Sequence, residues 1–101
     1  MEIYQRYLER LKQEVLLFAE GVEGDIFLYG SGARKEEKAD SDIDLGFDHM
    51  TKENFRDLER KILSFWEESS IPYDLDLVYF PQASKRFKEI AEQDKILWKQ
   101  S

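Results

Sequence analysis

Aspartates alternate with large apolar residues in two short segments of this 101-residue chain. The segments are residues 42–47, Asp-Ile-Asp-Leu-Gly-Phe, and residues 73–80, Tyr-Asp-Leu-Asp-Leu-Val-Tyr-Phe. Successive side chains of a β-strand point to opposite faces, so each segment would present aspartates on one face and apolar side chains on the other. The pattern therefore predicts a sheet with one acidic face and one apolar face that other elements must cover.

The rest of the chain has the periodicity of helices that could cover such a sheet. Apolar residues recur at three- and four-residue steps in the first twenty residues, and again after Thr51, which is suited to an N-cap. Residues 26–29 form a run of strand formers that ends at Gly30, and a last amphipathic segment precedes the apolar residues 96–98. We expect one α+β domain over residues 1–101, a small mixed sheet with helices packed on one face.

The charge balance bears on possible partners. Asp and Glu outnumber Lys and Arg by 22 to 15, which gives a formal charge of −7 and a pI near 4.7. A polynucleotide demands a basic surface, so direct nucleic-acid binding is not expected. The chain has no cysteine, no signal-like start and no run of eighteen apolar residues. We expect a cytoplasmic protein without a membrane partner.

A glycine-serine turn follows the strand expected at residues 26–29. Its sequence is Gly-Ser-Gly-Ala-Arg, residues 30–34. Backbone N–H groups at such a turn, with the positive end of a following helix dipole, attract anions. Gly30 and Ser31 are therefore candidate ligands for the phosphates of a nucleoside triphosphate, and Arg34 could offset charge that develops there. The structural alternatives are turn geometry for the glycines, a helix cap for Ser31 and a surface ion pair for Arg34.

Asp42, Asp44 and Asp76 are expected to lie together on the acidic face. Three neighbouring carboxylates are unfavourable unless cations compensate them, and Mg²⁺ suits a site that offers oxygen ligands alone. Two Mg²⁺ ions about 4 Å apart, bridged by Asp42 and Asp44, could bind the attacking oxygen and the triphosphate. Asp76 would hold the ion beside the attacking hydroxyl and is a candidate to accept its proton. The reaction class is nucleotidyl transfer at the α-phosphate, with pyrophosphate leaving.

Some of these assignments have alternatives. Asp74 lies two residues before Asp76 on the same face, so periodicity does not choose between them, although the flanking Leu75 and Leu77 favour Asp76. Either aspartate could instead be a solvated strand carboxylate. His49, the single histidine, follows the second expected strand and is interpreted as a loop residue rather than a base.

In their order and spacing, these motifs resemble the DNA polymerase β-like nucleotidyltransferase superfamily, and specifically its minimal single-domain (MNT) members. The pattern of that family is G-S-x-A-R after a strand, a polar spacer, S-D-x-D-L, and a third aspartate on a later strand. It is matched here by residues 30–34, 41–45 and 75–78. The chain has Lys35 where family members often have glycine, which could alter the turn or add a phosphate contact.

The resemblance implies a specific partner and reaction. Proteins of this minimal kind resemble the antitoxin half of toxin–antitoxin pairs whose toxin is a HEPN-domain ribonuclease, and in such pairs the MNT protein can transfer AMP from ATP to a toxin tyrosine. By resemblance we expect a Mg²⁺-dependent adenylyltransferase that uses ATP and forms a hetero-oligomer with such a toxin. The alternatives are a non-catalytic antitoxin that blocks its partner sterically, and a small-molecule nucleotidyltransferase. Retention of the three aspartates favours the first hypothesis over the second, and the short chain disfavours the third.

Overall fold

The computed structural model describes residues 3–30 and 42–100. Within them, no helix is both long enough and apolar enough to cross a membrane. The elements follow in the order α1 (Ile3–Phe18), β1 (Asp25–Tyr29), β2 (Ile43–Asp48), α2 (Lys52–Ser69), β3 (Leu75–Tyr79), the 3-10 turn η1 (Phe80–Gln82), α3 (Lys85–Glu92) and β4 (Ile96–Lys99). The expected strands and helices are therefore present, and the C-terminal apolar residues form a strand.

The four strands form one mixed sheet in the order β3-β2-β1-β4. β1 pairs antiparallel with both β2 and β4, whereas β2 and β3 are parallel. The parallel pair requires a crossover, and α2 supplies it. The α+β fold with a mixed sheet is confirmed.

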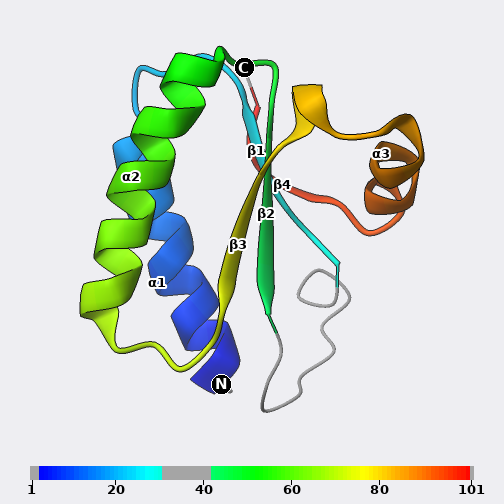
Figure 1. Ribbon diagram of the computed structural model, residues 1–101. Helices are drawn as coiled ribbons and strands as arrows, with labels where there is room; N and C mark the ends of the chain where they lie inside the picture. Colours follow the sequence, from blue (N-terminus) through cyan, green and yellow to red (C-terminus); the bar gives the residue numbers. More distant parts are fainter. Residues whose placement is uncertain (1–2, 31–41, 101) are drawn as a thin grey trace.

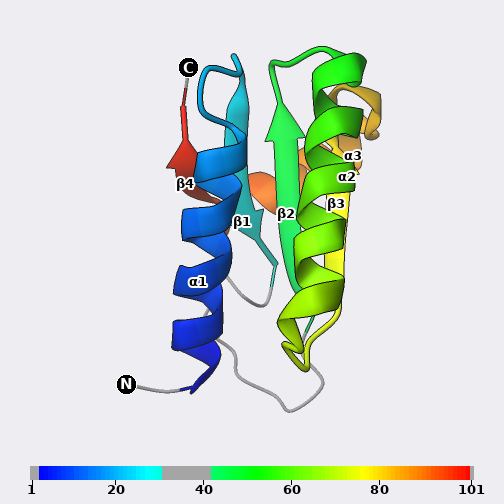
Figure 2. The ribbon, with the colours of Figure 1, turned by 90° about the vertical axis from the view of Figure 1, so that its left-hand side faces the viewer.

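The two long helices, α1 and α2, cover one face of the sheet, as Figures 1 and 2 show. The N-cap prediction for α2 is confirmed, because the Thr51 hydroxyl accepts a hydrogen bond from the Asn54 N–H at 3.1 Å. The core between the helices and the sheet consists of alternate residues of β1 and β2 and of the apolar side chains along α1 and α2. Its fully buried members include Leu11, Val15, Ile26, Ile43, Leu45, Phe47, Leu58 and Ile62.

The short helix α3 corrects the expectation that the helices pack on one face. It lies on the opposite side of the sheet from α1 and α2 (Figure 1). A second buried cluster forms there from Phe27 and Tyr29 of β1, Phe80 of η1 and Ala91 of α3. β1 is buried on both faces, so α3 covers part of the face on which β2 and β3 present their aspartates.

Candidate active site

One row of side chains crosses three strands on the face opposite α1 and α2. The strand register pairs Tyr29 of β1 with Asp44 of β2, and Asp44 with Asp76 of β3. Side chains of directly paired residues lie on the same face of a sheet. The fold thus brings two of the three predicted carboxylates side by side, next to the end of β1 and Gly30.

The pKa of the Asp44 carboxyl is raised above its ordinary value. The main cause is burial, and the negative charges of Asp76 and Asp42 add to it. Both neighbours disfavour ionisation of Asp44 because like charges repel at short range. The three aspartates are therefore electrostatically coupled, and Asp44 is the carboxylate that would gain most from a bound cation.

The structure distinguishes Asp76 from Asp74 as the candidate site residue, which periodicity alone could not do. Asp76 is the direct neighbour of Asp44 in the register, whereas Asp74 precedes β3, and its carbonyl accepts a hydrogen bond from the Ile43 N–H at 2.8 Å. Asp42 likewise precedes β2, and the side chains of Asp42, Asp74 and Asp76 are all exposed. Asp76 is thus the better placed of the two alternatives to act together with Asp44.

Gly30 brings the backbone against the Asp44 carboxylate. Its φ of +76° lies in the left-handed region, and a Cβ at this position would be 2.9 Å from Oδ2 of Asp44. Glycine meets both demands, because it adopts positive φ at little cost and has no side chain to displace the carboxylate. Ser31 and Arg34, the other predicted phosphate ligands, lie outside the described residues, as does Lys35.

We expect Gly30→Ala to lower the free energy of unfolding by about 1–2 kcal/mol through left-handed strain, and to weaken Mg²⁺–nucleotide binding at least about tenfold because Asp44 must move. The matched control is Gly21→Ala. Gly21 has a similar φ of +80°, but a Cβ added there would have no atom within 4 Å. Both variants should lose similar stability in denaturant titrations, and only Gly30→Ala should lose affinity in calorimetry. Equal nucleotide affinity of the two variants would contradict the assigned contact.

The described residues do not by themselves form a complete metal site. Among residues 3–30 and 42–100, no group of three or more histidine, aspartate or glutamate side chains is arranged to hold an ion. Mg²⁺ in phosphoryl-transfer sites is commonly bound by one or two carboxylates together with substrate phosphates and water. The raised pKa of Asp44 and its oxygen-only neighbours fit such a shared site.

Tyr29 is the member of the row that the sequence analysis did not single out. Tyr29 is 8% exposed, and its ring packs edge-to-face against Phe80 and Phe87, with centroid separations of 5.5 and 5.8 Å. Burial, followed by the charges of Asp44 and Asp76, raises the pKa of the Tyr29 hydroxyl, so the phenol stays neutral. Residues 26–29 are all apolar or aromatic, so no alternation marked Tyr29 as a residue of the carboxylate face.

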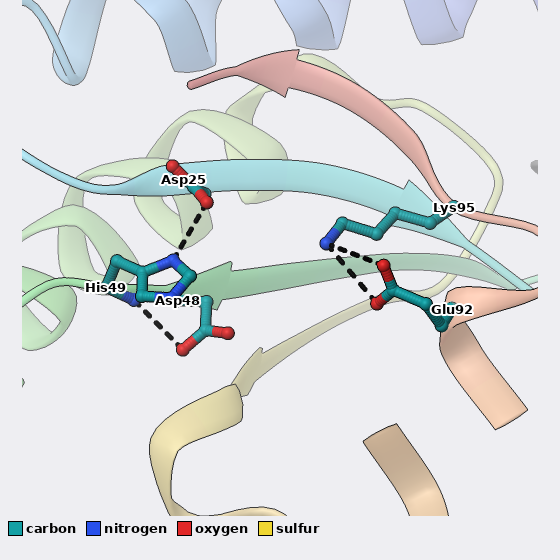
Figure 3. Close-up of polar contacts among 5 residues, drawn as sticks. All are labelled: Asp25, Asp48, His49, Glu92 and Lys95. Carbon is teal, nitrogen blue, oxygen red and sulfur yellow. Dashed lines mark hydrogen bonds and ion pairs between the residues drawn. The ribbon is translucent and has the colours of Figure 1, made fainter. Parts of the chain in front are cut away.

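His49 lies at the other end of the strands, away from Asp44. The ring Nδ1 of His49 is 2.9 Å from Oδ2 of Asp25, and the backbone N–H of His49 donates a hydrogen bond to Oδ1 of Asp48 at 2.9 Å, as Figure 3 shows. His49 has a left-handed φ of +54° and a side chain that is 69% exposed, whereas that of Asp25 is 11% exposed. The hydrogen bond joins the β2–α2 turn to the start of β1, which agrees with a loop residue rather than a catalytic base.

The pKa of His49 is raised, mainly by the hydrogen bond to Asp25 and then by the negative charge of Asp48. The charge of Asp25 adds to the rise, whereas slight burial and the charge of Lys95 oppose it. A raised folded-state pKa means that the contribution to stability is complete below the ordinary value of about 6.5 and is lost as pH rises through the folded-state pKa. We therefore expect the stability advantage of the wild type over His49→Asn to shrink between about pH 5.5 and 8.5. Asparagine tolerates the left-handed backbone but does not titrate. Chemical denaturation at both pH values measures this, and an unchanged difference would contradict it.

A mixed sheet with neighbouring aspartates on one face, beside a glycine turn at a strand end, defines the nucleotidyltransferase class of site. The chain belongs to the polymerase beta nucleotidyltransferase family, whose family model matches residues 22–101. The resemblance found in the sequence motifs is thereby confirmed at the level of the family. No curated protein matches the sequence significantly.

Solved structures share this fold at low sequence identity. A minimal nucleotidyltransferase has a TM-score of 0.67 and 21% identity over 90% of this chain and 92% of its own. A chain of a toxin–antitoxin crystal structure with AMP-PNP has a TM-score of 0.64 and 18% identity, over 89% and 73%. A chain from the complex of a tri-AMPylated Shewanella oneidensis HEPN toxin with its MNT antitoxin has a TM-score of 0.59 and 16% identity, over 92% and 72%. These similarities establish the fold.

Proposed function

We propose that this nucleotidyltransferase is an antitoxin that transfers AMP from ATP to a tyrosine hydroxyl of a HEPN-domain ribonuclease partner, with Mg²⁺ as cofactor. The observation that carries the proposal is the coupling of Asp44 with Asp76 and Asp42 on one face, beside Gly30. The family membership supports the reaction class. The structures with AMP-PNP and with an AMPylated HEPN toxin, which share the fold, support the choice of nucleotide and acceptor.

In this proposal the backbone of Gly30 and the hydroxyl of Ser31 bind the phosphates of ATP, and Arg34 offsets charge that develops on them. Asp42 and Asp44 would hold Mg²⁺. When bound, the ions supply positive charge to the triphosphate and to the attacking oxygen. The remaining contribution of the protein is positioning, which is a large part of catalysis in phosphoryl transfer.

Asp76 would hold the ion beside the acceptor hydroxyl and take the proton of that hydroxyl. The Asp76 side chain is exposed, so an acceptor from another protein can approach it, whereas Asp44 is partly buried. The two carboxylates thus have different environments, which suits different roles. The raised pKa of Asp44 also means that cation binding should displace protons from this group and strengthen as pH rises.

The test supplies α-labelled ATP, Mg²⁺ and a HEPN-domain ribonuclease partner. We expect label on a tyrosine of the partner and loss of its ribonuclease activity, with neither result for the Asp42→Ala/Asp44→Ala double variant. Full neutralisation by the double variant would contradict the proposal and indicate a steric antitoxin. Labelling of a small molecule in place of either protein would also contradict it.

A further inference from the structure

The helix α3 exposes apolar side chains immediately beside the candidate active site. Phe87 is 39% exposed although its ring packs against Tyr29 and Phe80, and Ile90, one turn further along the helix, is 57% exposed. Tyr29 in turn lies next to Asp44 in the strand register. These exposed apolar side chains therefore lie on a helix that packs on the sheet face opposite α1 and α2, the face that presents Asp44 and Asp76 (Figure 1).

The first turn of α3 carries charges that the helix itself does not favour. Lys85, Arg86 and Lys88 lie in the first four positions, and no acidic residue accompanies them. Cations at a helix N-terminus oppose the macrodipole and so destabilise the helix. The helix is already capped, since the Ser84 hydroxyl accepts a hydrogen bond from the Phe87 N–H at 3.1 Å. A basic turn in a chain of net charge −7 thus has no evident structural benefit.

We propose that α3 is the docking surface for the acceptor protein and selects an acidic segment that carries the tyrosine to be modified. This inference rests on the proposed function and adds the chemistry of the acceptor. Phe87 and Ile90 contact the tyrosine ring and its apolar neighbours, while Lys85 and Arg86 pair with acidic side chains that flank them. Because Phe87 packs against Tyr29, which is paired with Asp44 in the strand register, a tyrosine docked on Phe87 would lie on the same sheet face as Asp44 and Asp76.

The first test measures binding of two fluorescent peptides to the protein loaded with Mg²⁺ and AMP-PNP, by anisotropy at low salt. One peptide is Glu-Glu-Tyr-Glu-Ile and the other is Lys-Lys-Tyr-Lys-Ile. We expect the acidic peptide to bind at least about tenfold more tightly, and the preference to weaken as salt is added. Equal affinities, or failure to bind the acidic peptide, would overturn the inference.

The second test uses the charge reversal Lys85→Glu/Arg86→Glu, with Arg56→Glu on α2, on the other side of the sheet, as the matched control. The α3 variant should lose the preference for the acidic peptide and have an equal or higher Tm, because acidic residues suit a helix N-terminus. Phe87→Ser should weaken binding of both peptides, and Phe87→Leu should restore much of it. Arg56→Glu should behave as the wild type, and a charge-reversed variant that keeps the acidic preference would overturn the inference.

Other occupants of α3 give different results. If Lys85 and Arg86 bind the triphosphate, the charge reversal will weaken AMP-PNP affinity instead of peptide affinity. If α3 binds a second copy of the chain, the charge reversal will convert a dimer to a monomer, as measured by sedimentation. Either result overturns the inference. Failure of the proposed function is seen separately, as a wild type that does not bind Mg²⁺–AMP-PNP at all.

Discussion

Replacing Asp44 by asparagine is expected to reduce AMP transfer by about 10²–10³-fold, the loss typical of removing a central electrostatic contributor to a transition state. Asp44 is the middle member of the Tyr29–Asp44–Asp76 row, and its carboxylate meets the backbone at Gly30. Asparagine keeps the size of the side chain but removes the charge that would bind Mg²⁺. Transfer of label from α-labelled ATP measures the loss, and Asp74→Asn, outside the row, is the control and should retain most activity.

The same substitution should not destabilise the protein when Mg²⁺ is absent. The raised pKa of Asp44 means that the folded state binds its proton more tightly than the unfolded state does. Stability contributed by this group is therefore lost as pH rises from about 4 through the folded-state pKa. In EDTA at neutral pH, Asp44→Asn should be as stable as the wild type or more so, and its advantage should disappear in acid. An inactive variant that is also strongly destabilised at neutral pH would contradict this account, because it would indicate a structural role.

Gly46→Ala should cause the largest loss of stability among single-atom additions to the sheet. A Cβ on Gly46 would be 2.3 and 2.4 Å from two ring atoms of Phe27 and 2.7 Å from the ring of Phe80. These rings pack edge-to-face at a centroid separation of 4.7 Å and cannot both withdraw, because Tyr29 and α3 pack against them. Overpacking of this kind costs about 2–3 kcal/mol, which corresponds to a decrease in Tm of roughly 10–20 °C for a domain of this size.

The double variant Phe27→Leu/Gly46→Ala tests whether the loss comes from this contact. Leucine lacks the distal ring atoms that the new methyl group would meet, so the double variant should be more stable than the sum of the two single changes predicts. Thermal unfolding of all four proteins gives the coupling. Additive effects, or a Gly46→Ala protein as stable as the wild type, would contradict close packing of the two rings against Gly46.

The alternation of aspartates and apolar residues was enough to predict the two faces of β2 and β3. Ile43, Leu45 and Phe47 are buried against the helices, and Asp44 and Asp76 lie on the other face. The prediction succeeded because β2 and β3 are covered on only one face near Asp44 and Asp76. Polar and apolar residues therefore alternate there with the two-residue period of a strand.

The position of α3 could not be predicted in the same way. An amphipathic helix period indicates that a helix has an apolar side, but it does not say which face of a sheet receives that side. β1 is buried throughout, with Ile26 and Leu28 toward α1 and α2 and Phe27 and Tyr29 toward α3. A strand that is apolar on both faces carries no alternation, so the place of Tyr29 beside Asp44 became visible only in the strand register.

The central claim is that Asp42, Asp44 and Asp76 act together on cations and a triphosphate next to Gly30. A crystal structure of the wild type with Mg²⁺ and AMP-PNP tests it most directly. We predict density for Mg²⁺ bound by oxygens of Asp42 and Asp44, phosphates against the backbone at Gly30, and Asp76 facing the α-phosphate. Nucleotide bound elsewhere, or phosphates at Gly30 without a cation on these carboxylates, would contradict the account.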